Sequence, residues 1–439
     1  MSDYVFPADL ADRVTERWHT MAARPEGRLP MLPRPADLRH VLATAFFASF
    51  EREEGRNLRF VLCCSPDLEV TRDGFGEIVP VMPLEAPRPV SVATLRSLAP
   101  AVSANNAAIL IRCPVSDDDK QRCEIAGVLH VGAHLARARS GRSFYYRPAP
   151  HALIVDVRDA GELHIYQSGM KLAAMKGGRL YDQIAYSALE FLPLTEILAR
   201  GEQALRTRVA IPDHEPAHET SDFHWTALLN TILCIVNGVK EHGHGGTMLL
   251  VSPDAAPTLP IHTKFDIHER VNILGNRFVH FLNARHQLAE ARWRRKAASH
   301  IEAHATALSI LENTAFDAEE GLGDAADFVA RLTAVDGALV ITSDLRVLGF
   351  GAEIVLDTAV PVSAYEVVGD PDRSGAWPEL DSQSFGMRHR SALRCVSVSN
   401  SVAAFVVSQD NSVSFIWKKG RQVLLKKNVN TSNPNMVGA

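Results

Sequence analysis

The chain has 439 residues and a formal net charge of −5, with 46% hydrophobic and 22% charged residues. This length accommodates two or three domains, and the composition is that of an ordinary globular protein. The charge gives no broad basic face for nucleic acid, and no apolar run approaches the ~20 residues that a membrane helix needs. Six cysteines fit neither a metal spacing nor a disulfide framework. We therefore expect reduced thiols and a cytoplasmic protein without a membrane or nucleic-acid partner.

The first half of the chain shows alternating helical and extended patterns. Apolar residues at helical spacing predict helices over residues 4–21, 36–54 and 91–98. Short apolar runs predict strands over residues 59–62, 77–81, 107–112, 127–131 and 152–157. Residues 162–176 read as a hairpin. These elements predict an α+β domain over residues 1–215 that ends in a proline-rich linker and contains no recognisable catalytic constellation.

The second half begins with an apolar-faced helix over residues 222–241, which a glycine turn at 243–246 connects to a buried strand over 247–251. Residues 267–313 are strongly helical and carry a basic cluster that we expect on a solvated face. We expect further elements in chain order: a helix over 324–332, strands over 339–341 and 347–352, a loop over 367–384, a helix over 391–397, and strands over 403–407 and 413–417. The Asn- and Ser-rich residues 430–439 predict disorder.

Three short polar segments stand out against these elements. They are Asp336-Gly337-Ala338, Gly386-Met387-Arg388-His389-Arg390-Ser391 and Val407-Ser408-Gln409. A guanidinium suits phosphate oxygens, and an imidazole can donate to phosphate or bind a metal. Glycine lets the backbone approach a ligand. Taken alone, the Arg-His-Arg segment is more typical of a solvated turn before the next element.

The ordered set of segments resembles the diadenylate cyclase (DAC) domain. In that family Asp-Gly-Ala starts a strand, Gly-Thr-Arg-His-Arg precedes a small residue, and the following strand usually ends in Val-Ser-Glu. Here Met387 stands in place of the threonine and Gln409 in place of the glutamate. The helix, glycine turn and strand over residues 222–251 are also similar to the start of a DAC domain. The resemblance covers the C-terminal half, and the N-terminal half looks like one of the sensor modules fused ahead of DAC domains.

The resemblance implies an enzyme that condenses two ATP molecules into cyclic di-AMP and pyrophosphate, with Mg²⁺ or Mn²⁺ as cofactor. It also implies a homo-oligomer, at least a face-to-face dimer. It assigns catalysis and metal binding to Asp336 and His389. It assigns nucleotide contacts to Gly337, Ala338, Gly386, Met387, Arg388, Arg390, Ser391, Ser408 and Gln409. The alternative is a catalytically inactive, DAC-like nucleotide-binding sensor protein.

We therefore expect an α+β or α/β protein of two domains. The sensor domain spans residues 1–215, and the DAC-like domain, a mixed β-sheet flanked by helices, spans residues 216–425. A helical insertion lies at about residues 264–320, and residues 426–439 form a disordered tail. The apolar residues Leu288, Ile301 and Leu308 of the insertion need a partner surface, which the first domain or a second protomer would supply.

Overall fold

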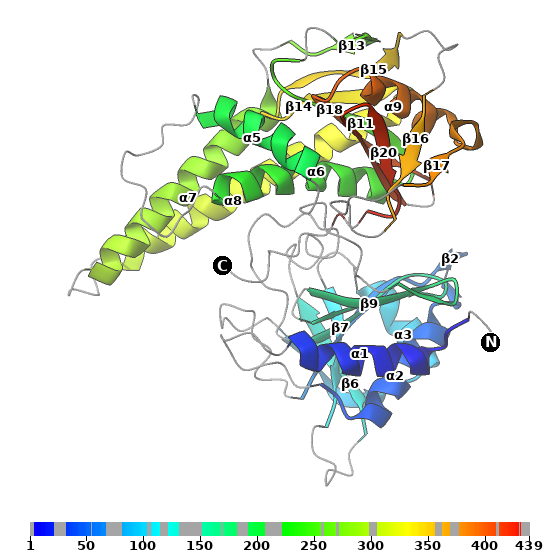
Figure 1. Ribbon diagram of the computed structural model, residues 1–439. Coiled ribbons are helices and arrows are strands. Elements are labelled where there is room, and N and C mark those ends of the chain that lie inside the picture. The colour runs from blue at the N-terminus through cyan, green and yellow to red at the C-terminus, as the bar shows by residue number, and fades with distance from the viewer. Residues whose placement is uncertain are drawn as a thin grey trace. The chain divides into compact units, whose positions relative to one another are not determined.

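The computed structural model describes most of the chain as two compact units. The described residues are 4–21, 32–53, 55–66, 81–102, 107–114, 122–130, 152–167, 170–181, 192–206, 222–255, 259–268, 272–297, 305–355, 362–368, 377–409, 412–429 and 431. The first unit consists chiefly of Met1–Arg139 and Tyr146–Ile184, and the second chiefly of Ala185–Met436. Each unit combines helices with a β-sheet (Figure 1), which confirms the expected mixed fold class.

The first unit is built on a sheet to which the described residues contribute eight strands, in the order β10-β9-β8-β7-β3-β5-β6-β4. Their bounds are β3 Phe60–Ser65, β4 Val81–Pro89, β5 Ala107–Arg112, β6 Glu124–His130, β7 Leu153–Asp159, β8 Glu162–Gln167, β9 Met170–Lys176 and β10 Arg179–Tyr181. Strands β3 and β5 are parallel, whereas the other neighbours are antiparallel. A separate small ribbon pairs β1 (Arg52–Glu53) with β2 (Arg56–Asn57).

Helices α1 (Pro7–Met21), α2 (Pro35–Ala48) and α3 (Val92–Leu98), the last followed by the short η1 (Ala99–Ala101), share a core with one face of this sheet. Alternate strand residues form a second buried cluster, which includes Val61, Cys63, Leu110 and Ile154. Both faces of the sheet are therefore buried, and this explains why its central strands read as continuous apolar runs.

One helix and one strand predicted for this unit differ from the elements that the structure describes. The helix predicted over residues 36–54 ends at Ala48, because Ser49 turns the chain by donating from Oγ to Phe46 O at 2.6 Å. The strand predicted over residues 77–81 lies almost wholly outside the described residues, and β4 begins at Val81.

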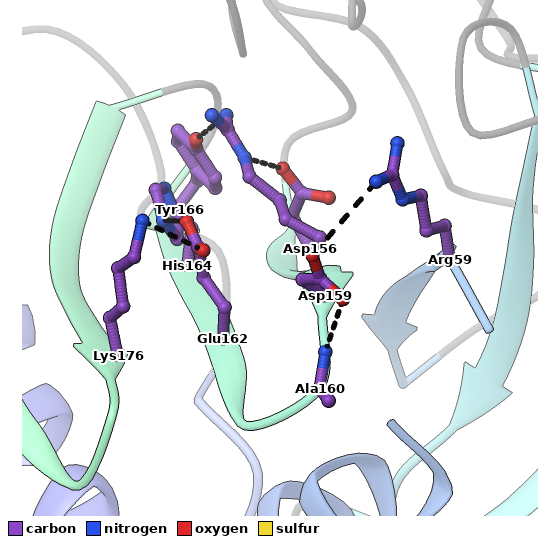
Figure 2. Close-up of polar contacts among 9 residues, drawn as sticks. Arg59, Asp156, Asp159, Ala160, Glu162, His164, Tyr166 and Lys176 are labelled. Carbon is purple, nitrogen blue, oxygen red and sulfur yellow. Dashed lines mark hydrogen bonds and ion pairs between the residues drawn. The ribbon is translucent and has the colours of Figure 1, made fainter. Parts of the chain in front are cut away.

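A polar cluster lies on strands β7, β8 and β9 of the first unit (Figure 2). The fully buried Asp156 accepts a hydrogen bond from Arg158 Nε at 2.8 Å, and Arg158 Nη2 donates to Tyr166 Oη at 2.8 Å. Glu162 pairs with Lys176 at 3.2 Å. Burying a charge is costly unless it is paired, so these contacts account for the charged residues of this region as structural groups.

The second unit is built on a mixed sheet to which the described residues contribute ten strands, in the order β12-β15-β14-β11-β18-β19-β20-β16-β17, with β13 also paired to β15. Their bounds are β11 Gly246–Val251, β12 Ile261–His262, β13 Phe265–Asp266, β14 Ala338–Thr342, β15 Val347–Ile354, β16 Ala364–Glu366, β17 Glu379–Leu380, β18 Val402–Val407, β19 Val413–Lys419 and β20 Gln422–Lys426. Strand β11 is central, because it pairs in parallel with β14 and antiparallel with β18.

Helices cover both faces of this sheet. On one face, α5 (Leu192–Arg206), α6 (Asp222–His242), α7 (Ile273–Ala297) and α8 (Ala305–Arg331) share a core with Met248, Leu339 and Phe405. On the other face, α9 (Met387–Ser397) packs with Leu249 and Val340. Consecutive residues of one strand therefore enter opposite cores, as the pleat requires.

The helical insertion consists of the two consecutive helices α7 and α8, which lie side by side (Figure 1). The helix predicted separately over residues 324–332 is the end of α8. Leu288 is 2% exposed and Leu308 8% exposed, and both belong to the core of the second unit, while Ile301 lies outside the described residues. The partner surface for these two leucines is thus inside the same unit, and neither the first domain nor a second protomer is needed.

The domain boundary differs from the expected position near residue 215. Helix α5 belongs to the second unit, where Leu198 is buried. Gly201 of this helix lies against Ser343, in the turn that follows β14, so closely that an added Cβ would lie 2.2 Å from Ser343 O. At the other end, Thr431 is 2% exposed and accepts at its carbonyl from Asn237 Nδ2 at 3.1 Å. Residues 427–429 and 431, which were expected in a disordered tail, are therefore part of the described structure, and residues 430 and 432–439 lie outside it.

Candidate functional site

The turns that carry the predicted site residues meet at one edge of the second sheet. In the register, Thr247 pairs with Ala338, Gly246 with Val407, and Val407 in turn with Val413. The residues just before β11 and β14 and just after β18 therefore lie next to one another. This edge brings together Asp336, Gly337, Ser408 and Gln409 with the glycine turn that precedes β11.

Gly337 sits where no side chain fits. Its φ of +121° is unfavourable for other residues, and an added Cβ would lie 2.4 Å from the carbonyl carbon of Gly351 on β15. Asp336 directly precedes this close contact between Gly337 and β15, and it is exposed at the edge of the sheet. The Asp-Gly-Ala segment thus places a carboxylate at the start of β14, while Ala338 is buried as the first residue of that strand.

A lysine that the sequence pattern did not single out lies near this carboxylate. Lys264, between β12 and β13, packs its side chain against Gly351 and pairs with Glu353 through an Nζ–Oε1 distance of 2.8 Å. The hydrogen bond and charge of Glu353, and then the charge of Asp336, raise the pKa of Lys264 above its usual value. The two carboxylates and the lysine therefore form one electrostatic group at the surface.

The Arg-His-Arg segment is helical, which corrects the expectation that the helix begins at residue 391. Helix α9 starts at Met387, and Gly386 is its N-cap without a side-chain capping bond. Its first turn contains no acidic residue and carries Arg388 and Arg390. Positive side chains are unfavourable at the positive end of a helix dipole, so these two arginines do not stabilise the isolated helix.

Arg388 connects this helix to the edge of the sheet. An added Cβ at Gly245, where φ is +65°, would lie 3.0 Å from Arg388 Nη1 and 2.7 Å from Val407 O. Within the described part of the chain, Arg388 makes no ion pair with a carboxylate. Arg390 donates from Nη1 to Gln383 Oε1 at 3.4 Å, a weak contact. Both guanidiniums are therefore uncompensated by carboxylates of the described residues.

His389 is held by a neighbour that sequence analysis missed. Its Nε2 lies 3.1 Å from Oγ of Ser414, a 5% exposed residue of β19, and its ring centroid lies 5.3 Å from that of Phe385. A serine among the apolar residues at the beginning of β19 was the available signal. No local signal marks Lys264, whose position depends on the packing of β13 against β15.

Asp336 and His389, the two residues expected to share a metal ion, lie at different strands of the sheet. His389 contacts β19, whereas Asp336 precedes β14, and strands β11 and β18 lie between these two strands. Adjacent strands are about 4.8 Å apart, so β14 and β19 are separated by about 14 Å. The sharing of one metal ion by Asp336 and His389 stays a prediction.

The remaining predicted residues surround the same edge. Met387 is 75% exposed, Ser391 is half-buried in α9, and Gln409 is exposed. Ser408 is half-buried, and its N–H donates to Ser412 O at 2.9 Å, which closes the turn between β18 and β19. Gly386, Met387 and the two arginines form the helical side of the site, and Asp336, Gly337, Ser408 and Gln409 form the strand side.

Comparison with known proteins gives one match, in the first unit. A family model described as "Probable sensor domain DACNV" matches residues 28–130, a region that contains α2, β3, α3, β5 and β6. No curated protein and no solved structure matches the chain. No DAC catalytic family model matches the second unit. Residues 28–130 of the first unit are thus similar to a probable sensor domain.

Among the described residues, every helix is too short or too polar to cross a bilayer.

Proposed function

We propose that the second unit is a diadenylate cyclase, which condenses two ATP molecules into cyclic di-AMP and pyrophosphate under control of the first unit. The observation that carries this proposal is the contact of Arg388 with Gly245, at the edge where Asp336 and Gly337 open β14. Two segments far apart in the sequence, each matching a DAC signature, meet there. The sensor match in the first unit supports the same class of protein.

The first turn of α9 is suited to bind the triphosphate. Its backbone N–H groups have no side-chain cap, and Arg388 and Arg390 add two positive charges. Anions bind readily at such helix ends, and guanidiniums pair with phosphate oxygens through charge-assisted hydrogen bonds. A bound triphosphate would offset the repulsion between the arginines and the helix dipole, about 0.3–1 kcal/mol for each charge.

In this proposal Asp336 acts on the attacking group. In the reaction the 3′-oxygen of one ATP bonds to the α-phosphorus of the other, the bond to the β-phosphate oxygen breaks, and pyrophosphate leaves. The exposed Asp336 carboxylate would orient the 3′-hydroxyl and, together with phosphate oxygens, hold Mg²⁺ or Mn²⁺. The bound ion would neutralise phosphate charge and make the hydroxyl more acidic. Lys264 limits the excess negative charge beside Asp336.

The reaction requires two chains if each holds one ATP. The two sites must then face one another across a two-fold axis, with the same surface contributed by both copies. The specific activity is expected to rise with protein concentration until the dimer saturates. A specific activity that is independent of concentration down to the point where scattering shows only monomers would contradict this arrangement.

A second candidate function is a non-catalytic nucleotide sensor with the same fold. Met387 presents an exposed thioether in place of a hydroxyl, and Gln409 presents an amide, a weaker ligand for a hard cation than a carboxylate. Thermal stabilisation by ATP together with product analysis separates the two functions. Stabilisation with cyclic di-AMP formation indicates the cyclase, and stabilisation without product indicates the sensor.

A further inference from the structure

Three thiols lie together in the first unit, within the region that matches the sensor family. Cys113 follows β5, Cys123 precedes β6, and Cys64 lies on the neighbouring strand β3. The Sγ atoms of Cys113 and Cys123 are 3.0 Å apart, and Cys64 belongs to the same buried cluster. All three are at most 5% exposed and face the core beneath the helices.

The backbone at this position is suited to a disulfide. Arg112 and Glu124 are the last pair of the antiparallel β5–β6 ladder, so Cys113 and Cys123 occupy the next facing positions. Facing residues of antiparallel strands have Cα atoms about 4.5–5.5 Å apart, which lies within the range that disulfides span. The sulfurs need to approach by only about 1 Å to reach the bonding distance of about 2.05 Å.

A small hollow borders the cluster. It is lined by Cys64 and Cys113 with Ser65, Leu32 and three prolines. The N–H of Cys113 is fixed to Ser65 O at 3.1 Å, so the strand end that borders the hollow is anchored. Of the two facing cysteines, Cys113 is thus the one that lines the hollow.

We infer that Cys113 and Cys123 are a redox-active dithiol of the sensor unit, oxidised to a disulfide by a hydroperoxide. The sulfur of Cys113 attacks one peroxide oxygen, the O–O bond breaks, and the thiol proton leaves with the other oxygen as water or an alcohol. Cys113 is then a sulfenic acid. The sulfur of Cys123 attacks the sulfur of Cys113, and the displaced hydroxide leaves as water with the proton of Cys123. Two electrons pass from the thiols to the peroxide.

The surroundings make this dithiol react slowly. Asp37, in the first turn of α2, is 8% exposed and lies near Cys123, while Arg34 pairs with it through Nε at 2.5 Å. The Cys113 hydrogen bond, burial and the Asp37 charge raise the pKa of Cys123, so its thiol stays protonated near neutral pH. Disulfide formation would remove this thiol proton near Asp37 at the start of α2. The oxidation state would thereby change the environment of a helix of the first unit.

The test is peptide mapping of the folded full-length chain after treatment with hydrogen peroxide. The chain has six free thiols before treatment, and oxidation of the pair should leave 6 − 2 = 4 titratable thiols in denaturant. Digestion without reductant should yield the Cys113 and Cys123 peptides linked and lighter by two hydrogens. Dithiothreitol should restore all six thiols. A second sample treated with glutathione disulfide, which is larger than the hollow, should react more slowly.

Cys63 supplies the matched control, because it neighbours Cys64 in sequence but is buried in the opposite core. Cys113→Ser and Cys123→Ser should each abolish the cross-link, whereas Cys63→Ser and Cys64→Ser should retain it. A cross-link between Cys64 and Cys113, retention of six thiols, or sulfenic acid at Cys63 to the same extent would overturn the inference. Because wild-type mapping identifies the linked cysteines directly, the result does not depend on the folding of any variant. It is also independent of whether the second unit turns over ATP.

Discussion

Nε2 of His389 lies 3.1 Å from Oγ of Ser414, and this contact joins the first turn of α9 to the beginning of β19. It fixes the imidazole of the Arg-His-Arg segment on the sheet. The serine is 5% exposed, so its hydroxyl is oriented by the surrounding core and not by solvent.

Removal of this hydroxyl should affect the orientation of His389 more than the folding of the chain. Ser414→Ala is expected to lower kcat for cyclic di-AMP formation about fivefold, since one hydrogen bond contributes about 1 kcal/mol, with KM for ATP little changed. Ser414→Thr retains the hydroxyl and should restore most of the rate. Equal rates for the alanine variant and the wild type would show that the contact has no role in positioning the imidazole.

The two arginines should contribute to ATP affinity itself. Each charge-assisted contact with phosphate is worth about 1.5–3 kcal/mol, so Arg388→Ala with Arg390→Ala should raise the Kd for ATP by at least about 100-fold in calorimetry. Arg394→Ala, in the last turn of the same helix, is the matched control and should leave Kd unchanged. Without ATP the double variant should be as stable as the wild type or more so, because it relieves repulsion at the helix end. An unchanged Kd removes the phosphate-binding assignment.

Asp336 should matter for turnover and little for binding. Asp336→Asn keeps the size of the side chain but removes the charge, so ATP should still bind while product formation falls below detection. Lys264→Ala should retain most of the turnover, because this lysine is exposed and solvent screens the effect of its charge on Asp336. Initial rates and Kd values of both variants check this order of effects. Near-normal rates for the asparagine variant would show that Asp336 is structural.

The buried imidazole of His224 should make the stability of the second unit depend on pH. It is 6% exposed on α6, and its Nε2 lies 2.8 Å from Nε2 of His286 on α7. Burial, the neighbouring His286 and Arg206 lower the pKa of His224 to about 4. The unfolded chain then binds the extra proton below about pH 6.5, so the free energy of unfolding falls as the pH decreases from about 6.5 to about 4.

From pH 7 to pH 5 this loss should amount to about 2 kcal/mol in urea denaturation. His224→Asn should flatten the dependence, whereas His280→Asn, at an exposed position on α7, should leave it as in the wild type. If the His224 and His280 variants show the same slope, the buried imidazole does not control acid stability.

The sequence patterns predicted the elements whose signal is local. Strand β11 and strand β18 are continuous apolar runs buried on both faces, and both were predicted within a residue or so of their bounds. The start of α9 was missed because Gly386 gives no side-chain cap and the first turn contains no apolar periodicity. The assignment of α5 to the first domain failed because a proline-rich segment after it resembles a linker. Its true environment depends on the contact of Gly201 with Ser343, a long-range packing that no local pattern encodes.

The site shows the same division between local and long-range information. Asp336 and Arg388 were selected from short motifs, and the register of β11 explains how their segments reach one edge. Ser414 and Lys264 were not selected, because the role of a buried serine or an exposed lysine depends on the residue that it contacts in the folded chain. Only the strand order shows that two other strands separate β14, which Asp336 precedes, from β19, which His389 contacts.

The most direct test of the central claim is product analysis with the full-length chain. Purified protein is incubated with ATP and either Mn²⁺ or Mg²⁺, nucleotides are identified by mass spectrometry, and ATP binding is followed in parallel by thermal shift. The account predicts cyclic di-AMP, with two ATP consumed and two pyrophosphates released for each product molecule. Thermal stabilisation by ATP without product under either metal would contradict cyclase activity and support the nucleotide sensor, and absence of both would contradict a nucleotide site altogether.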